Sequence, residues 1–420
     1  MHSTKNSSPR LRFPEFVDDW KLIRLGDLFN ERIEFTRDDL PLHSLTIEAG
    51  VVPKSERYER SFLIRSTDDA YKVMHKDDFA FNPMNLRFGA LARYKNSERI
   101  LVSKYYNIFF CNENADPVFA ENYLTSYNVI QYYNKMASGT LDEKKRVHYS
   151  DFVNFKLRYP QLREQQKIAA FLSAVDEKIA QITKRKALLL KYKKGVMQQI
   201  FTQKIRFKDD DGNNFPDWKH SRFDEVFLFL PTNSFSRKDL NHLEGEVKNI
   251  HYGDIHTKFR ALLNTDAEEV PFINKEISLA KIPQSNYLRT ADLVFADASE
   301  DYADIGKCVE IGRTNGEKIL SGLHTLLARP RANKVAHVFG TYLMKTWSVR
   351  RQIMREAQGT KVLGISTGRL ATIMLMLPSM AEQAKIADFI SMLEKKIEIV
   401  SVQLEEIKAF KKSLLQQMFI

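Results

Sequence analysis

Residues 164–173 read EQQKIAAFLS, and residues 382–391 read EQAKIADFIS. The second segment begins 218 positions after the first (382 − 164), and the same offset continues without a gap to the glutamine pairs at 198–199 and 416–417. A duplicated segment of this kind predicts one structural unit per copy. The sequence therefore predicts two similar helices, each of which follows a separate body of the chain.

Both helical segments place apolar side chains at alternating steps of four and three residues, the 3.5-residue period of a coiled-coil seam. Lys186 and Lys193 interrupt this row in the first segment, and Lys411 interrupts it in the second. The predicted seam consists of Ile168, Leu172, Val175, Ile179, Ile182 and Leu189 in the first segment and of Ile386, Ile390, Leu393, Ile397, Val400, Leu404 and Ile407 in the second.

Each helix is expected to run for about 35–40 residues, and each residue adds about 1.5 Å to the length of the helix. Ser379 and Glu382 form a possible capping box at the start of the second helix. We expect antiparallel pairing, because the first helix delivers the chain to the second body and the second helix can then return it to the first body. The alternative is that each helix packs only on its own body.

The segments before each body are also repeated. Residues 13–15 and 20–21 read FPE and WK, and residues 215–219 read FPDWK. Within the bodies, residues 78–82 and 292–297 are predicted as equivalent buried strands, and residues 100–103 and 318–321 as another pair. Residues 120–136 and 337–356 are predicted as helices. Each body is therefore expected to have an α+β fold, which divides the chain into a first domain, residues 1–159, a helix, residues 160–203, a second domain, residues 204–377, and a second helix, residues 378–420.

The composition favours a polyanionic partner. The 420 residues carry a net charge of +11, and the pI is about 9.3. Lys and Arg release condensed counterions from a phosphate backbone, so such a balance suits nucleic acid. Cys111 and Cys308 are the only cysteines, which argues against a disulfide framework and fits a reducing cytoplasm. No apolar run approaches the roughly 20 residues of a membrane span, and the N-terminal residues do not resemble a secretory signal.

On these repeated features, the chain resembles the specificity subunits of type I restriction–modification systems. The similarity covers the leading segments, the turn at residues 253–256, the Gly-Thr loops at 139–140 and 359–360 and, above all, the duplicated helix motif. It implies two target-recognition domains separated by an antiparallel coiled coil, with each domain recognising one half of a bipartite site in double-stranded DNA. It also implies docking of two methyltransferase subunits and of restriction (motor) subunits. S-adenosylmethionine, ATP and Mg are then expected on those partners, and no cofactor or metal on this chain.

Catalytic motifs were sought as an alternative, since a self-contained DNA methyltransferase or nuclease would also bind DNA. Residues 82–84 read NPM and lack the second proline and the aromatic residue of an adenine methyltransferase loop. Residues 143–145 and 394–396 match a nuclease Glu-x-Lys tripeptide, but such a short pattern is common by chance. The sequence therefore predicts a non-catalytic subunit with no catalytic residue of its own.

Candidate DNA contacts are basic and aromatic residues in the predicted loops of the bodies. Arginine favours guanine edges, and any Lys or Arg can contact phosphate. Each residue taken singly is better explained as a solvated surface charge, and we expect some members of the whole set to contact DNA. The candidates are Arg87, Lys144, Lys145 and Arg146 in the first body and Tyr252, Lys258, Arg260 and Lys361 in the second.

Overall fold

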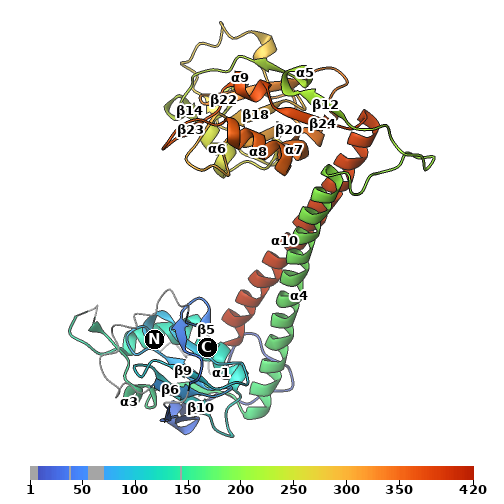
Figure 1. The fold of residues 1–420 in the computed structure, drawn as a ribbon. Coiled ribbons are helices and arrows are strands. Elements are labelled where there is room, and N and C mark those ends of the chain that lie inside the picture. The colour runs from blue at the N-terminus through green and yellow to red at the C-terminus, as the bar shows by residue number, and fades with distance from the viewer. Residues whose placement is uncertain (1–7, 37–38, 55–70, 142–143) are drawn as a thin grey trace. The chain divides into compact units, whose positions relative to one another are not determined.

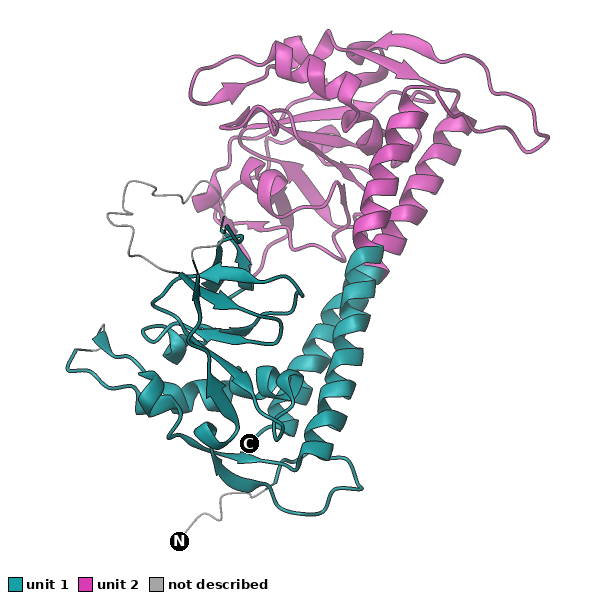
Figure 2. Ribbon diagram, turned by 60° about the horizontal axis from the view of Figure 1, so that its bottom comes forward, with its two compact units in different colours: residues 1–185, 400–420 teal, residues 186–399 magenta. Residues whose placement is uncertain are grey.

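A computed structural model describes residues 8–36, 39–54, 71–141 and 144–420. The chain forms two compact units, which are treated separately below (Figure 2). Unit 1 comprises residues 1–185 and 400–420, and unit 2 comprises residues 186–399. Each unit contains one head of mixed strands and helices and a portion of each of two long helices (Figures 1 and 2).

The two long helices are α4, Leu162–Phe201, and α10, Met380–Met418, with 40 and 39 residues. Their predicted lengths are confirmed. In unit 1, Lys411 of α10 contacts Asp176 of α4, and in unit 2, Lys193 of α4 contacts Glu394 of α10. The early part of each helix thus meets the late part of the other, so the helices pair antiparallel, as the sequence predicts.

The predicted seam positions lie on the inner faces of this pair. Most are buried, and Ile179, Ile182, Leu189, Ile397 and Ile407 are partly buried. The first turns of each helix also pack on the adjacent head, since Ile168 and Leu172 share one core cluster with Trp20 and Phe119 of unit 1. The helices therefore pack on their own bodies at these ends and also pair along the seam, so the alternative that each helix packs only on its own body was wrong.

The described residues of the head of unit 1 form four small sheets. A strand from the leading segment, β1, pairs antiparallel with β11, the strand that enters α4, so both ends of the head meet at the helix. The sheets are β1 (Lys21–Arg24) with β11 (Lys156–Tyr159), the four strands β2 (Phe29–Glu31), β10 (Asn107–Cys111), β7 (Phe79–Phe81) and β8 (Leu91–Arg93), the three strands β3 (Phe35–Thr36), β6 (Tyr71–Met74) and β9 (Ile100–Val102), and β4 (His43–Thr46) with β5 (Gly50–Pro53).

The head of unit 2 repeats the joining strands, since β12 pairs antiparallel with β24, which enters α10. Its sheets have two, five, four and two strands. They are β12 (Lys219–Arg222) with β24 (Met374–Leu377), the five strands β13 (Phe227–Leu230), β22 (Thr325–Pro330), β18 (Leu293–Ala296), β20 (Cys308–Ile311) and β16 (Leu262–Leu263), the four strands β14 (Leu240–Asn241), β17 (Phe272–Ile273), β15 (Val247–Ile250) and β21 (Lys318–Ser321), and β19 (Ala298–Ser299) with β23 (Leu363–Gly364).

The strands predicted within residues 78–82, 100–103, 292–297 and 318–321 are all present. The single helices predicted over 120–136 and 337–356 were wrong, because each is two helices. Ser126 and Thr346 adopt extended backbone angles as N-caps of the second helix, which breaks the first. The head helices are α1 (Pro117–Leu124), α2 (Tyr127–Met136), α3 (Tyr149–Phe152), α5 (Phe223–Val226), α6 (Tyr252–Thr257), α7 (Phe339–Met344), α8 (Trp347–Glu356) and α9 (Thr367–Ala371).

The residues that follow the seam of α10 complete the core of unit 1. Phe419 is buried, and its ring lies 5.6 Å from Phe119 and 5.2 Å from Tyr123. The backbone N–H of Leu11 donates to the carbonyl of Gln417 at 3.0 Å. Residues 400–420 are therefore an integral part of the same core as the head at the beginning of the chain.

None of the helices in the described residues has the length and apolar character required to cross a membrane.

Candidate nucleic-acid interface

The glutamate of the repeated helix motif joins each helix to the segment that leads into its head. In unit 1, Glu164 is buried and accepts hydrogen bonds from Arg12 at 2.7 Å through both carboxylate oxygens and from the Trp20 indole at 3.2 Å. In unit 2, Glu382 accepts from Arg206 at 3.1 and 2.8 Å and from the Trp218 indole at 3.1 Å. Each buried carboxylate thus has a charged partner and a neutral donor.

The predicted capping box at Ser379 and Glu382 is therefore only half present. The Ser379 hydroxyl accepts the backbone N–H of Glu382 at 3.3 Å. The Glu382 carboxylate does not return to the cap, because Arg206 and Trp218 bind both of its oxygens.

The glutamine of the motif fixes the other side of the head. The Gln165 side chain donates to the carbonyls of Pro160 and Asn114 and accepts the N–H of Asp116 at 2.9 Å. Gln383 repeats this pattern with the carbonyls of Pro378 and Lys334 and the N–H of Ala336. We call each Glu-Gln pair with its partners the head clamp. The two head clamps orient both heads on their helices in the same way.

In unit 1, the structure brings the candidate residues into two adjacent loops. Residues 138 and 146 pair through two backbone hydrogen bonds of 3.0 and 2.9 Å, so that Lys144, Lys145 and Arg146 lie in or beside a short hairpin. The N–H of Val147 donates to the carbonyl of Pro83 at 2.9 Å, which ties this hairpin to the turn before η4, Leu86–Phe88. Arg87 lies in η4.

The side chains in these loops combine positive charge with an exposed aromatic ring. The Arg87 guanidinium lies 4.3 Å from the centroid of Phe88, which is 54% exposed. Lys144 and Arg146 are exposed, and Lys145 is partly buried. Cationic side chains next to an accessible aromatic face are suited to phosphate and base contacts.

Unit 2 contains the corresponding hairpin. The backbones of Gln358 and Gly364 pair at 2.9 and 2.7 Å, and the N–H of Ile365 donates to the carbonyl of Asp297 at 2.8 Å. Lys361 is exposed in the hairpin. Gly359 has a φ of +129°, and a side chain there would collide with the carbonyl of Val362. The tight hairpin therefore explains the glycine of the Gly-Thr loop.

Tyr252 begins α6 and lies among three histidines. Its ring centroid is 4.6 Å from that of His251, 6.4 Å from His256 and 5.3 Å from His324. Burial lowers the pKa of His251, and the charge of nearby Arg237 lowers it further. Since Nδ1 of His251 accepts the backbone N–H of Gly253 at 3.1 Å, the neutral ring caps α6. The turn predicted at residues 253–256 is thus part of a short helix.

The two remaining candidates of unit 2 have acidic neighbours. Lys258 lies 3.5 Å from Asp254, which also accepts two hydrogen bonds from Arg237. The Arg260 guanidinium donates to Glu398 of α10 at 2.7 Å. The structure therefore places Arg260 at the contact between head and helix, away from the hairpin of Lys361.

A polar pocket that no sequence pattern predicted lies beside this hairpin. The cavity has a volume of about 600 Å³ and is lined by Asp297, His324, Arg369 and residues 362–367 of the hairpin and α9. His324 Nδ1 lies 3.2 Å from a carboxylate oxygen of Asp297, and burial raises the pKa of Asp297. His324 has a φ of +55°, a feature that no local sequence pattern indicates.

A metal site is not formed by the residues that the structure describes, since no three His, Cys, Asp or Glu side chains among them gather closely enough. The two cysteines are unsuited to nucleophilic chemistry, because burial raises the pKa of both Cys111 and Cys308 to about 12.

Both repeats of the chain match one known protein family. The family model of the type I restriction modification DNA specificity domain matches residues 17–191 and 217–409. The MjaVIII type I restriction enzyme specificity subunit of Methanocaldococcus jannaschii is 26% identical over 276 residues, which are 63% of this chain and 61% of that protein. The chain thus matches about three fifths of this relative's length.

Two solved structures share the fold. The S subunit of a type I restriction-modification system from M. genitalium has a TM-score of 0.54 and 13% identity, with 98% of this chain and 99% of the other covered. The HsdS subunit from Thermoanaerobacter tengcongensis has a TM-score of 0.51 and 17% identity, with 95% and 96% covered. The two matched segments include the Glu-Gln pair of each head clamp and most of the chain, and the chain therefore belongs to the family of the type I restriction modification DNA specificity domain.

Proposed function

We propose that the chain is the DNA-specificity subunit of a type I restriction–modification enzyme. Each head recognises one half of a bipartite site in double-stranded DNA, and the paired helices set the unread spacer between the halves. The domains are residues 1–159 and 204–377, and residues 160–203 and 378–420 are the helical segments. The net charge of +11 supports a phosphate-backbone partner.

The observation that carries this proposal is that the same head clamp occurs in two heads whose loops differ. Glu164 and Glu382 hold the heads in equivalent ways, whereas the candidate contacts of the two heads differ. The hairpin of unit 1 carries a basic run, Lys144 to Arg146, on its closing side, and the hairpin of unit 2 contains Lys361 as its one basic residue. A common frame with different loops is suited to two recognition tasks of the same kind on different sequences.

We assign base and phosphate contacts to Arg87, Lys144, Lys145 and Arg146 in the first head. In the second head we assign them to Tyr252, Lys258, Arg260 and Lys361. Phosphate contacts position the protein, and contacts with base edges give the specificity. The exposed Phe88 beside Arg87 adds a surface on which a base or sugar can pack.

In this proposal the chain has no catalytic step of its own. Two methyltransferase subunits dock on it and use S-adenosylmethionine, and restriction subunits with ATP and Mg complete the assembly. The name of its relative, a specificity subunit, and the high pKa of both thiols support this division of labour. The assembly acts on chromosomal or incoming DNA, and we place it in the cytoplasm.

Methylation mapping tests the proposal. Cells that carry this chain with its cognate methyltransferase subunit should methylate a split motif with a fixed gap. A chimera in which residues 228–377 come from another member of the family should change one half of the motif and keep the other half. A continuous motif, no motif, or methyl transfer by the purified chain alone would contradict the proposal.

A further inference from the structure

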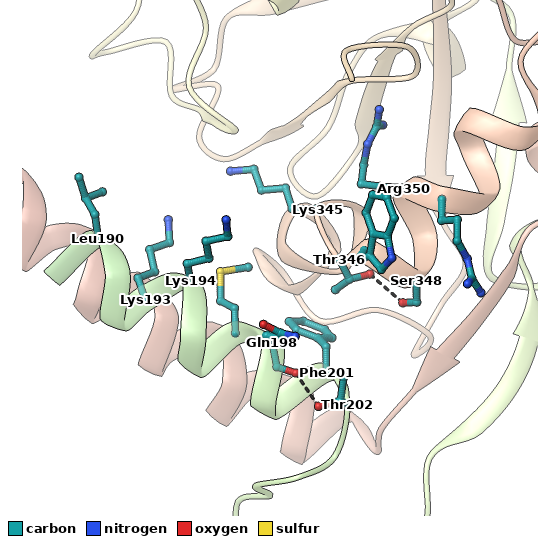
Figure 3. A pocket seen from close by; sticks show the side chains of 13 residues that line it. Leu190, Lys193, Lys194, Gln198, Phe201, Thr202, Lys345, Thr346, Ser348 and Arg350 are labelled. Atoms are coloured by element: carbon teal, nitrogen blue, oxygen red, sulfur yellow. Dashed lines mark hydrogen bonds between the residues drawn. The ribbon is translucent and has the colours of Figure 1, made fainter. Parts of the chain in front are cut away.

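A groove in unit 2 lies between the last turns of α4 and the junction of α7 with α8. Its volume is about 780 Å³, within the range of roughly 300–1,000 Å³ typical of binding pockets. The side chains of Lys193 and Lys194 project into it from α4, and Lys345 reaches toward them from the other wall (Figure 3). Neither candidate DNA-binding loop of this unit lines it.

The rim of the groove is cationic, and its charges are of two kinds. Lys193 is paired with Glu394, and Arg350 donates to the backbone carbonyls of residues 303, 305 and 306. Lys194 and Arg351 are exposed and form no ion pair with any part of the chain that the structure describes. The positive end of the α8 dipole, at Thr346, adds to their potential.

The floor and one wall are apolar. Met197 and Phe201 line the groove from α4, and Phe201 is held by ring contacts with Trp218 at 6.1 Å and Phe339 at 5.8 Å. Trp347, the first residue of α8, is 68% exposed, and Leu190 is 48% exposed. An accessible tryptophan beside a preformed apolar pocket is typical of the anchor point of a protein interface.

Unit 1 repeats the central features at the equivalent positions. Tyr127, the first residue of α2, is 70% exposed, as Trp347 is at the start of α8. Lys411 and Lys412 of α10, and Phe419 directly after α10, follow Lys193, Lys194 and Phe201 of α4 at the constant offset of 218 positions (411 − 193). Both units therefore carry an exposed aromatic residue at the start of a head helix and two successive lysines late in a long helix.

We propose that the groove of unit 2 docks an acidic segment of a protein partner, in which an apolar or aromatic side chain lies between Asp or Glu residues. The anchor fills the space between Met197, Phe201 and Trp347, and the acidic residues face Lys194, Lys345 and Arg351. A DNA backbone would satisfy the cations but leave the apolar floor without a partner. Resting on the proposed function, this inference assigns the segment to the methyltransferase subunit.

Trp347 provides a direct probe of occupancy. The chain has three tryptophans, and Trp20 and Trp218 are only 1% and 7% exposed. We would label the full chain with 5-fluorotryptophan, assign the Trp347 resonance with Trp347→Phe, and add unlabelled cognate methyltransferase subunit. The fluorine chemical shift of Trp347 should change and should become less sensitive to the solvent. The fluorine resonances of the buried tryptophans should change little.

Charge reversal tests the rim. The double variant Lys194→Glu/Arg351→Glu should bind the methyltransferase subunit at least about ten-fold more weakly, with a reduced dependence on salt. The control Lys191→Glu/Arg355→Glu changes two exposed residues of the same helices by the same total charge outside the groove, and it should bind within about two-fold of the unmodified chain. Thermal unfolding of both variants checks that they are folded.

Equal affinities of the two double variants, or a Trp347 resonance that does not move, would overturn the inference. It would also be overturned if the groove variant lost affinity for duplex DNA while its affinity for the methyltransferase subunit stayed unchanged. In each of these outcomes the unmodified chain would still direct methylation of a split motif in cells. Failure of the docking inference is therefore distinguishable from failure of the proposed function.

Discussion

The amino group of Lys411 donates hydrogen bonds to both carboxylate oxygens of Asp176, at 2.6 and 2.8 Å. Lys193 and Glu394 make the equivalent contact in unit 2, with both partners displaced by the repeat offset (411 − 193 and 394 − 176, each 218) and the helices exchanged. Both lysines occupy positions where the apolar seam is interrupted. A charged residue at a seam position specifies register and orientation at some cost in stability, because only one alignment supplies its partner.

Reversing one charge of this pair should destabilise the helices of unit 1. Lys411→Glu places a carboxylate against Asp176, whereas Lys411→Glu/Asp176→Lys restores opposite charges. A double-mutant cycle by urea unfolding should give a favourable coupling of about 0.5–1 kcal/mol, because both side chains remain partly exposed. If the double variant lost as much free energy of unfolding as the two single variants lose together, the pair would not contribute to register.

Removing the glutamate of a head clamp should have a much larger effect. Glu164→Ala leaves the Arg12 guanidinium and the Trp20 indole without their buried acceptor, so we expect a loss of about 3–5 kcal/mol in the free energy of unfolding. The Trp20 fluorescence spectrum should shift to longer wavelength in the same variant.

Glu177→Ala, on the exposed face of the same helix, provides a matched control that should change the unfolding free energy little. Comparable stability of the two variants would show that the buried carboxylate is not what joins the helix to the head. Glu382→Ala should reproduce the large loss in unit 2, because Arg206 and Trp218 surround it in the same way.

Glu310 should make the stability of unit 2 dependent on pH. Its oxygens accept the backbone N–H groups of Val338 at 2.5 Å and Thr341 at 2.7 Å, but burial outweighs these bonds and raises its pKa from 4.5 to about 7. Between these values the folded chain holds a proton that the unfolded chain has lost. The free energy of unfolding therefore falls as pH rises from about 4.5 to 7, by on the order of 3 kcal/mol.

Glu310→Gln removes the titrating group, so the stability of this variant relative to the unmodified chain should increase as the pH rises from 5 to 8. Urea unfolding of both proteins at several pH values measures the difference. A difference that stays constant over this interval would mean that Glu310 ionises normally in the fold.

Hairpin residues should contribute to DNA affinity in the assembled complex. Lys361→Ala removes an exposed charge, and we expect weaker binding to duplexes of any sequence. The slope of log affinity against log salt should decrease by about 0.9 for each phosphate contact that is lost. Lys144→Ala should act similarly through the first head.

Arg260→Ala serves as the comparison within the same head. Its guanidinium already pairs with Glu398, so we expect a smaller change in DNA affinity and in salt slope than for Lys361→Ala. A larger effect of Arg260→Ala would mean that Arg260 exchanges Glu398 for a phosphate when DNA binds.

The long helices were predictable, because the 3.5-residue period extends through many turns and needs no knowledge of distant residues. Their antiparallel pairing was predictable from the order of bodies and helices along the chain. The buried strands β7 and β18 were predictable for a similar reason, since each is a short apolar run next to a turn. The breaks at Ser126 and Thr346 were not, because apolar residues continue on both sides and the N-cap conformation depends on how the following helix packs.

The roles of Glu164 and of the Asp297–His324 pair could not be derived from local patterns. Glu164 meets Arg12 across 152 positions of sequence, and Asp297 meets His324 across 27. The repeat indicated that Glu164 and Glu382 have equivalent roles but not which side chains they bind. Loop residues such as Lys361 were chosen as candidates from their charge alone. The acidic partner of Arg260 could not be predicted, because it depends on how the head packs on α10.

The burial of Phe419 against Phe119 and Tyr123 has a consequence for biosynthesis. At about 5–20 residues per second, the ribosome needs roughly 10–40 s to synthesise residues 186–399 after residue 185. Throughout that interval the nascent N-terminal head lacks residues 400–420 and exposes the apolar surface that they cover. The head made first is therefore completed last, and chaperone demand during translation should fall chiefly on it.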